Sequence, residues 1–294
     1  MRIVVTLYDI DEIQRMAAMG ADVFLVPTHE LSTKTRSAFS MDELAAVIQK
    51  VHQVGKLAYI NLNTMIHEEN LPALDAMLSH LSTLDVDGIV CFDLTVLTEA
   101  TRFDLAKKII YRPGTMNTNS YDPWFFHKLQ IKGLTLSKDI TLEELVAIGE
   151  NYQGLEISVV GHGYLFLFYS KRPLLKNYFD HRGISVAGTR NSESLRLIEK
   201  SRKTDLYPIL EDRFGTHIFR AKKLQSFNEI KVLRPYLADF FIERIFLDDT
   251  EYYASIAAYA DESAEPDFLR TYGREYDTGF YYQKTLVTKG VDLG

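Results

Sequence analysis

The chain has 294 residues, of which 46 % are hydrophobic, and its formal net charge is −7. This length suits either one α/β barrel or two domains. The single cysteine, Cys91, excludes an intramolecular disulfide, a cysteine-ligated zinc site and a protein-held iron–sulfur cluster. We find no apolar run long enough to cross a membrane and no signal-peptide pattern, which favours a cytoplasmic protein.

The charge is unevenly distributed along the chain. Residues 171–234 hold 15 Lys and Arg against 7 Asp and Glu. The rest of the chain is therefore strongly acidic. Such a basic segment can attract phosphate, and tRNA is a candidate partner for it. A solvated surface of mixed charge is the alternative explanation.

Short β-rich runs alternate with amphipathic segments. In chain order, strands are expected at Ile3–Thr6, Val23–Val26, Leu57–Asn61, Gly88–Phe92, Lys108–Tyr111, Leu134–Ser137, Glu156–Val160 and Phe240–Glu243. The spacing of apolar residues predicts a helix over Met41–Val54, and Ser40 with Glu43 forms a capping-box pattern before it. Thr141 with Glu144 forms another.

Eight strands with helical connections predict a TIM-like (β/α)8 barrel over residues 1–248. Residues 170–225 form a long, basic insertion between the seventh and eighth strands. Residues 249–294 form an acidic C-terminal extension that holds 7 of the 17 tyrosines. We expect this extension either to fold back onto the barrel or to provide a docking surface, since tyrosine is enriched at interfaces.

Function in such barrels is built at the carboxyl ends of the strands. The polar residues expected there are Asn61, Asn63, Asp93, Arg112, Lys138, Asp139, His162 and Glu243. In "AYINLN" the two asparagines alternate with apolar residues, so they should point into the barrel. Similar reasoning on the fourth strand points Cys91 inward, one layer below Asp93.

His162 lies between two glycines at the end of the seventh strand. A neutral imidazole at the barrel mouth can act as a general acid or base, with Glu243, Asp139 or Asp93 as the orienting carboxylate. A structural histidine bonded to a loop carbonyl is the alternative. In "ILEDRFGTHIF", Glu211, Asp212 and Arg213 precede a Gly-Thr pair, a composition typical of a solvated turn.

Several segments together resemble peptidase family U32, the collagenase-like proteases. They are "AAMGADVFLVP", "FSMDELAAVIQKVHQVGKLAYINLNT", "LTLSKDITLEEL", "EDRFGTHIFRAKKL" and "FIERI", which occur in the family's order over nearly the whole chain. The signature region of the family resembles residues 159–179. Tyr169, Glu211, Asp212 and Thr216 lie in the segments that resemble the family, and we expect them to bind substrate beside the residues of the barrel mouth. Arg172, at the start of the basic segment, is a further substrate-binding candidate.

The chain departs from the family pattern at the cysteines that hold a four-iron four-sulfur cluster in some members. Phe166, Pro173 and Gln225 occupy three of those positions, and Cys91 is the only cysteine in the chain. The resemblance therefore implies a member that carries no cofactor. Arg244 and Ile245 also replace residues of the family's last-strand motif.

The family resemblance leaves three functions open. The first is a non-cluster subunit of the prephenate-linked system that makes 5-hydroxyuridine at the tRNA wobble position, working in a hetero-oligomer with a cysteine-bearing paralogue. The second is a collagenase-like peptidase that uses His162 with a carboxylate. The third is a barrel that binds a small carboxylate through Arg112 and Lys138, because fixed cations suit an anionic ligand.

Overall fold

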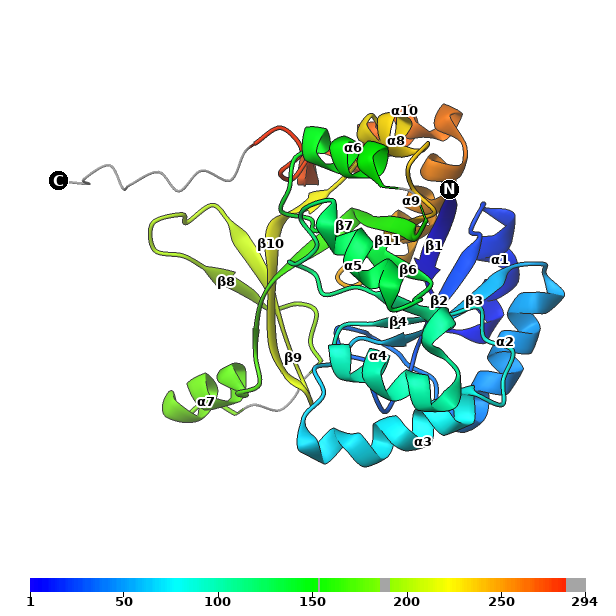
Figure 1. The fold of residues 1–294 in the computed structure, drawn as a ribbon. Helices are drawn as coiled ribbons and strands as arrows, with labels where there is room; N and C mark the ends of the chain where they lie inside the picture. The colour runs from blue at the N-terminus through cyan, green and yellow to red at the C-terminus, as the bar shows by residue number, and fades with distance from the viewer. Residues whose placement is uncertain (153, 186–190, 284–294) are drawn as a thin grey trace.

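The computed structural model describes residues 1–152, 154–185 and 191–283, and a closed barrel of parallel strands forms the centre of this part (Figure 1). Its strands are β1 (Arg2–Thr6), β2 (Val23–Pro27), β3 (Leu57–Leu62), β4 (Gly88–Cys91), β5 (Ile109–Tyr111), β6 (Gly133–Thr135), β7 (Glu156–Ser170) and β11 (Asp239–Ile242). β11 pairs in parallel with both β7 and β1, which closes the barrel. The predicted barrel fold is confirmed.

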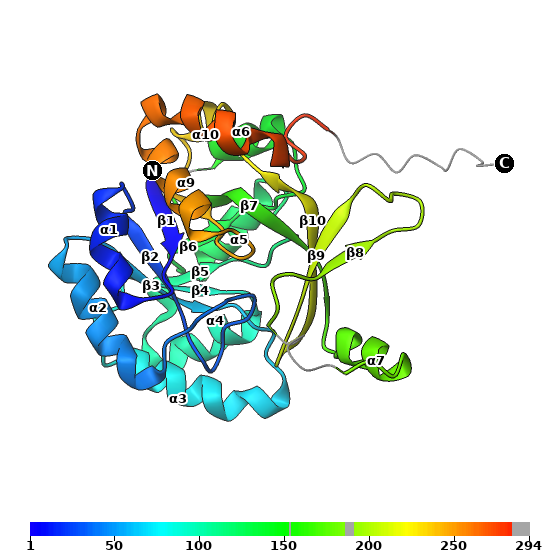
Figure 2. The same ribbon diagram turned by 180° about the vertical axis from the view of Figure 1, so that it is seen from behind.

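Helices cover the outside of the barrel (Figures 1 and 2). They are α1 (Ile13–Ala18), α2 (Leu44–Gln53), α3 (Leu71–Leu81), α4 (Leu94–Ala100), α5 (Tyr121–Lys128), α6 (Leu142–Asn151) and α8 (Glu229–Leu233). Both predicted capping boxes are present, at Ser40 and Glu43 and at Thr141 and Glu144. Each box satisfies backbone N–H groups that have no partner within the helix.

The apolar side chains form two layers, one inside the barrel and one between strands and helices. The inner cluster is Val4, Val23, Leu25, Tyr59, Val90, Ile110 and Phe241. Ala58, Ile60 and Leu62 belong to the outer layer, as predicted from "AYINLN". On β4, however, Val90 faces inward and Cys91 packs in the outer layer, so the predicted orientation of Cys91 is wrong.

A β-ribbon projects from one side of the barrel (Figure 1). β7 continues beyond the barrel and pairs antiparallel with β10 (Gly215–Leu224) from Gly163 to Ser170. β9 (Leu206–Asp212) and β8 (Arg196–Ile198) extend the ribbon, and α7 (Leu174–His181) lies near its end. The predicted insertion thus begins within β7 rather than after it.

The C-terminal extension packs against the barrel. It contains α9 (Asp249–Ala260), α10 (Glu265–Tyr272) and β12 (Tyr276–Asp277), which pairs with β10. Five of its tyrosines are buried: Tyr252, Tyr253, Tyr259, Tyr276 and Tyr281. Of the two arrangements considered for this segment, folding back onto the barrel is therefore the one observed for residues 249–283.

Candidate functional site

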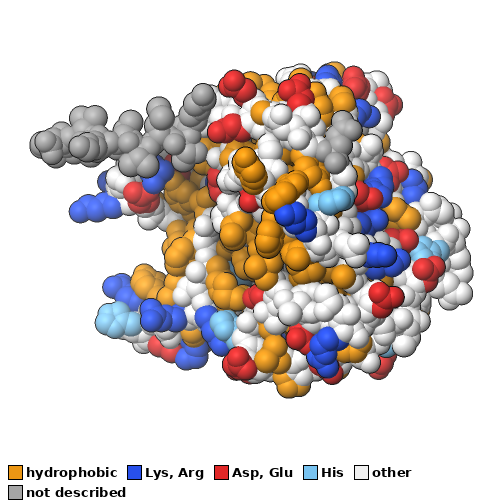
Figure 3. Space-filling model, viewed as in Figure 1, with side chains coloured by type: hydrophobic (Ala, Val, Ile, Leu, Met, Phe, Trp, Pro, Cys, Tyr) orange, Lys and Arg blue, Asp and Glu red, His pale blue; other side chains and the backbone are white. Residues whose placement is uncertain are grey.

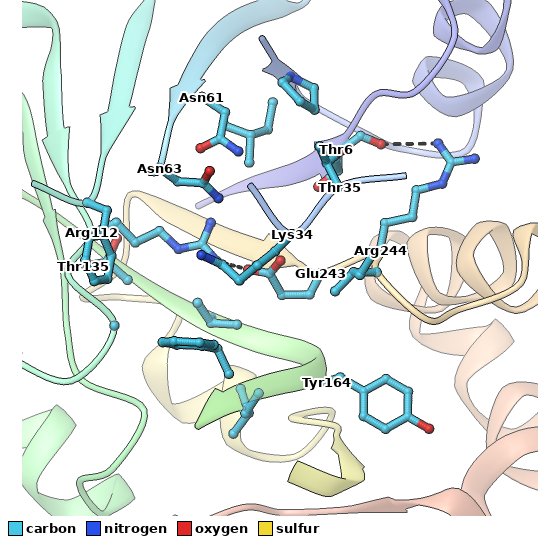
Figure 4. Close-up of a pocket in the computed structure, with 18 of the residues that line it drawn as sticks. Thr6, Lys34, Thr35, Asn61, Asn63, Arg112, Thr135, Tyr164, Glu243 and Arg244 are labelled. Carbon is cyan, nitrogen blue, oxygen red and sulfur yellow. Dashed lines mark hydrogen bonds and ion pairs between the residues drawn. The ribbon is translucent and has the colours of Figure 1, made fainter. Parts of the chain in front are cut away.

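A pocket opens at the carboxyl ends of the barrel strands (Figure 4). The pocket and its open entrance together have a volume of about 890 Å³. Its lining includes Thr6, Tyr8, Lys34, Thr35, Asn61, Asn63, Phe92, Arg112, Thr135, Lys138, Val160, Tyr164, Phe166, Phe219, Glu243 and Arg244. Five residues predicted from the sequence to lie at the mouth are therefore brought together here: Asn61, Asn63, Arg112, Lys138 and Glu243.

An ion pair between Arg112 and Glu243 crosses the pocket (Figure 4). The two residues follow β5 and β11, and their side chains are 17 % and 23 % exposed. The guanidinium group of Arg112 also lies 4.5 Å from the ring centroid of Phe241, at the bottom of the mouth. Burial lowers the pKa of Arg112 to about 10, so the group stays protonated at neutral pH.

Lys34 is a pocket residue that the sequence analysis missed. It comes from the loop after β2, and its ammonium group lies 4.9 Å from the ring centroid of Phe166 and 5.7 Å from that of Phe92. Burial lowers the pKa of Lys34 to about 8; Asp212 opposes this shift and Arg112 adds to it. A lysine that titrates so close to neutral pH is a common feature of functional sites.

Lys138 adds a third cation to the pocket wall. Its ammonium group donates to the Gly114 carbonyl at 3.0 Å and to Asp139 at 3.3 Å, and burial lowers its pKa. Asp139 does not line the pocket. Among the residues that line the pocket, Lys34, Arg112 and Lys138 outnumber the one carboxylate, Glu243. Since Arg112 pairs with Glu243 and Lys138 with Asp139, Lys34 is the cation in excess, which suits an anionic ligand.

Asn61 provides a polar contact that the protein itself does not use. Its side chain is 5 % exposed, and its Oδ1 is buried without a hydrogen-bond partner. Buried acceptors without a partner are rare, because each costs free energy. Since Asn61 lines the pocket, a ligand hydroxyl or amine is a suitable donor for this oxygen. Asn63 differs, since its Oδ1 accepts from the Thr33 N–H at 2.8 Å.

Arg244 lines the pocket but is occupied by structural contacts. It is 1 % exposed, and it donates two hydrogen bonds to Glu12, at 2.7 and 2.6 Å, and one to Asp249 at 2.9 Å. It also lies over the rings of Tyr8 and Tyr252. Arg244 therefore joins the first βα connection to α9 of the C-terminal extension.

His162 does not lie in the pocket, so its predicted position at the mouth is wrong. Its side chain is fully buried beneath the C-terminal extension. Nδ1 lies 3.2 Å from the hydroxyl of Tyr259 and Nε2 lies 3.1 Å from that of Tyr276. Phe227 and Phe268 complete an aromatic enclosure. Burial, with nearby Lys223, lowers the pKa of His162 to about 3.

The two glycines beside His162 allow close contact with β11 rather than with a ligand. A Cβ atom on Gly161 would lie 1.8 Å from the Phe240 ring. Gly163 has φ +99°, and a Cβ there would lie 2.6 Å from the Glu243 carbonyl oxygen. The strand therefore requires glycine at both positions because of packing.

Asp93 begins a helix instead of facing the pocket. Its carboxylate accepts from the N–H groups of Thr95 and Ile66, both at 2.9 Å, as the N-cap of α4. The prediction that Asp93 faces the barrel mouth is therefore wrong, as is the prediction that Cys91 faces inward one layer below it. Val90 and Phe92 are the residues of this segment that face the barrel interior.

Four of the remaining predicted residues hold the end of the ribbon together. Glu211 accepts from the N–H of Leu175 at 2.7 Å and from the Thr216 hydroxyl at 3.0 Å, which anchors the start of α7. Arg172 is exposed, and its carbonyl accepts from Thr216 at 2.9 Å. Tyr169 donates to the Phe214 carbonyl at 2.8 Å. None of the four lines the mouth pocket.

Asp212 connects the ribbon to the barrel. It accepts from Thr33 and, at 3.2 Å, from the Lys34 N–H, and it lies 3.3 Å from His217 Nε2. Burial alone would raise the pKa of Asp212, but the interactions with His217, the Thr33 hydroxyl and the Phe214 N–H lower it to about 2. His217 stacks on Tyr169 with centroids 5.2 Å apart. The inner face of the ribbon is thereby fixed against the loop that carries Lys34.

The family follows from comparison with known proteins. The profile described as "Peptidase family U32" matches residues 8–288. The chain belongs to peptidase family U32. The solved structure of the U32 peptidase Mk0906 is similar, with 17 % identity and a TM-score of 0.50, over 82 % of this chain and 91 % of that one.

Two curated relatives span most of this U32 chain. "tRNA hydroxylation protein P2" of Bacillus subtilis is 24 % identical over 287 residues, which cover 91 % of this chain and 93 % of the relative. "Uncharacterized protease MJ0090" of Methanocaldococcus jannaschii is 24 % identical over 290 residues, which cover 90 % and 69 %. In the described residues, no helix is both long and apolar enough to span a bilayer.

The residues at the predicted cluster positions of this U32 chain do not fit an iron–sulfur cluster. Phe166 and Pro173 have no donor atom, and Gln225 has no thiolate. Leu224 pairs antiparallel with Gly163, so Gln225 is level with His162, about 13 Å along the ribbon from Phe166. Over the described ranges, no three His, Cys, Asp or Glu side chains are grouped to hold a metal ion.

Proposed function

We propose that this U32 chain takes part in tRNA hydroxylation and that its mouth pocket binds a small carboxylate. The end-to-end similarity to tRNA hydroxylation protein P2 supports the process. The pocket supports the ligand class, because Lys34, Arg112 and Lys138 outnumber the single carboxylate in its lining. Prephenate, a dicarboxylate with one hydroxyl group, matches both the excess of cations and the free Asn61 oxygen.

In this proposal each pocket residue has a separate task. Arg112 offers a planar fork of donors for one carboxylate, and Lys34 attracts the second. Asn61 accepts from the ligand hydroxyl group. Phe92 and Phe166 provide apolar walls beside Lys34. When the ligand binds, Arg112 exchanges its ion pair with Glu243 for one with the ligand carboxylate, and the Glu243 carboxylate can then accept a proton from the ligand.

We further propose that the chain acts in the cytoplasm as a subunit without a cluster, beside a cysteine-bearing paralogue. The replacement of the cluster cysteines supports this division of labour. An RNA substrate also suits the basic segment 171–234. The expected product is 5-hydroxyuridine at the wobble position of tRNA.

The test is a clean deletion of the gene, together with any redundant hydroxylation system, followed by mass spectrometry of tRNA nucleosides. We expect 5-hydroxyuridine to fall and to return with the wild-type gene. Arg112→Met should fail to restore it, whereas Lys107→Glu, on the exposed surface, should restore it. Unchanged 5-hydroxyuridine in the deletion strain would rule out the proposal.

A peptidase function has weaker support from the site. The cluster of Thr33, Asp212 and His217 contains a hydroxyl, an imidazole and a carboxylate. However, Thr33 is 3 % exposed, and both partners contact the same ring nitrogen, Nε2. A catalytic triad instead uses both nitrogens of the ring. A peptidase function would be supported if the purified protein hydrolysed casein and the substitution His217→Ala abolished that activity.

A further inference from the structure

The β-ribbon has two different faces. Its inner face carries Phe166 and Phe219, which line the mouth pocket, and His217, which contacts the barrel loop. Side chains alternate between the two faces of a strand, so the neighbouring residues face away from the barrel. Phe168 pairs with Ile218 on this outer face, after a bulge that separates it from Phe166.

The start of α7 covers one end of the outer face, where Glu211 and Thr216 lie. Beyond α7 the outer face is apolar and partly open to solvent. Ile218 pairs with both Phe168 and Ile209, and Tyr207 lies two residues before Ile209 on β9. Tyr207 in turn pairs with Leu197 of β8. Phe168 is 48 % exposed and Leu197 is 38 % exposed. An antiparallel sheet with one face on the core normally has polar residues on the other face. The exposed apolar residues here therefore indicate a binding surface.

Cations stand at both ends of this face. Lys200 and Lys203 lie in the loop between β8 and β9, and Arg172 and Arg182 flank α7. All four are exposed, and none forms an ion pair with a described residue. Since β9 has seven residues, the two basic ends are about 20 Å apart. Figure 3 shows this side of the molecule as a hollow between two projecting arms that carry Lys and Arg side chains.

We propose that the outer face of the ribbon binds single-stranded RNA, such as the loop of a tRNA. Phosphates pair with exposed cations, and bases stack on aromatic rings such as those of Phe168 and Tyr207. An acidic protein is a poorer match, because lysine is depleted in protein interfaces. This inference rests on the proposed function, to which it adds the RNA-binding surface.

The test measures binding of a fluorescein-labelled anticodon stem–loop, with uridine at the wobble position, by fluorescence anisotropy over a range of salt concentrations. For Lys200→Glu with Lys203→Glu, we expect Kd to rise about tenfold or more and the salt slope to fall by about 1.4. Phe168→Ala should raise Kd about fivefold or more through lost stacking. The matched control, Lys50→Glu with Lys107→Glu, changes two exposed lysines elsewhere and should leave Kd unchanged.

The inference would be overturned if the wild-type protein did not bind RNA, if the ribbon variants bound it equally well, or if the control variant lost as much binding. Competition by poly-glutamate as strong as that by unlabelled RNA would assign the surface to acidic protein instead. Circular dichroism checks that each variant is folded. If the gene deletion lowers 5-hydroxyuridine while the ribbon variants still bind RNA, this inference fails and the proposed function stands.

Discussion

The imidazole of His162 stacks on the ring of Tyr276, with centroids 4.9 Å apart and Nε2 3.1 Å from the tyrosine hydroxyl. The Tyr276 hydroxyl donates a hydrogen bond to the Glu251 carboxylate at 2.7 Å. The Tyr276 oxygen therefore accepts from Nε2–H, which leaves Nδ1 to accept from Tyr259. His162 is thus a neutral histidine that links the barrel to the C-terminal extension.

His162→Phe should destabilise the protein by about 1–3 kcal/mol at pH 7, because two buried tyrosine hydroxyls lose a partner. The folded-state pKa of about 3 lies below the ordinary value of 6.5. The unfolded wild-type chain therefore gains a proton below pH 6.5 that the folded chain does not, and wild-type stability falls with acid. The difference in free energy of unfolding between the wild type and the variant should then shrink by up to about 1.4 kcal/mol for each pH unit below 6.5.

Urea unfolding of both proteins between pH 7 and pH 4 measures this difference. A difference in free energy of unfolding that stays constant over this range would contradict the neutral, buried state of His162. Full stability of the variant at pH 7 would contradict its structural role.

Lys34 should make anion binding sensitive to mild alkali. Its pKa of about 8 means that the ammonium group loses its proton as the pH rises above 8, whereas Arg112 stays charged until about pH 10. We expect Kd for prephenate to rise by up to about tenfold between pH 8 and pH 9. Isothermal titration calorimetry measures the change.

Lys34→Arg should remove this pH dependence, because arginine remains protonated throughout the range. Lys34→Met should bind weakly at every pH. Equal pH dependence in the wild type and in Lys34→Met would assign the titration to another group and contradict the prediction.

Arg112 and Glu243 should have opposite effects on the same ligand. Arg112→Met removes a donor fork and leaves a partly buried carboxylate without its partner, so prephenate binding should weaken by about 2–5 kcal/mol. Glu243→Gln frees the guanidinium group and should bind prephenate at least as tightly as the wild type. Equal losses in the two variants would show that the ion pair only supports the fold.

Arg244→Met should lower the free energy of unfolding by up to about 3–5 kcal/mol, because it leaves the partly buried Glu12 carboxylate without its main partner. Arg244→Lys should recover only part of this loss, since an ammonium group cannot form the two-pronged contact. Denaturant midpoints at neutral pH measure both variants. A midpoint within error of the wild type for Arg244→Met would contradict this assignment.

The barrel was predictable because its strands alternate with helices in a regular pattern. The orientation of Asn61 was predictable because polar and apolar residues alternate in "AYINLN". In "GIVCFD" both faces are apolar, so the segment gave no orientation signal, and the placements of Cys91 and Asp93 were wrong.

The surroundings of His162 were not predictable, because its partners Tyr259 and Tyr276 lie 97 and 114 residues away along the chain. Lys34 escaped notice for a different reason. It lies in the loop "STKTRSAF", where neither periodicity nor a motif distinguishes one cation from another. Only the return of the ribbon over the barrel mouth places Phe166 against it.

β7 passes from the barrel wall into the ribbon as one unbroken strand. The ribbon consequently cannot be excised as a separate cassette. Removing a single residue between Gly163 and Phe166 would turn the Phe166 side chain away from Lys34 and remove it from the pocket wall. Natural or engineered changes of length are therefore best tolerated in the loop that joins β8 to β9.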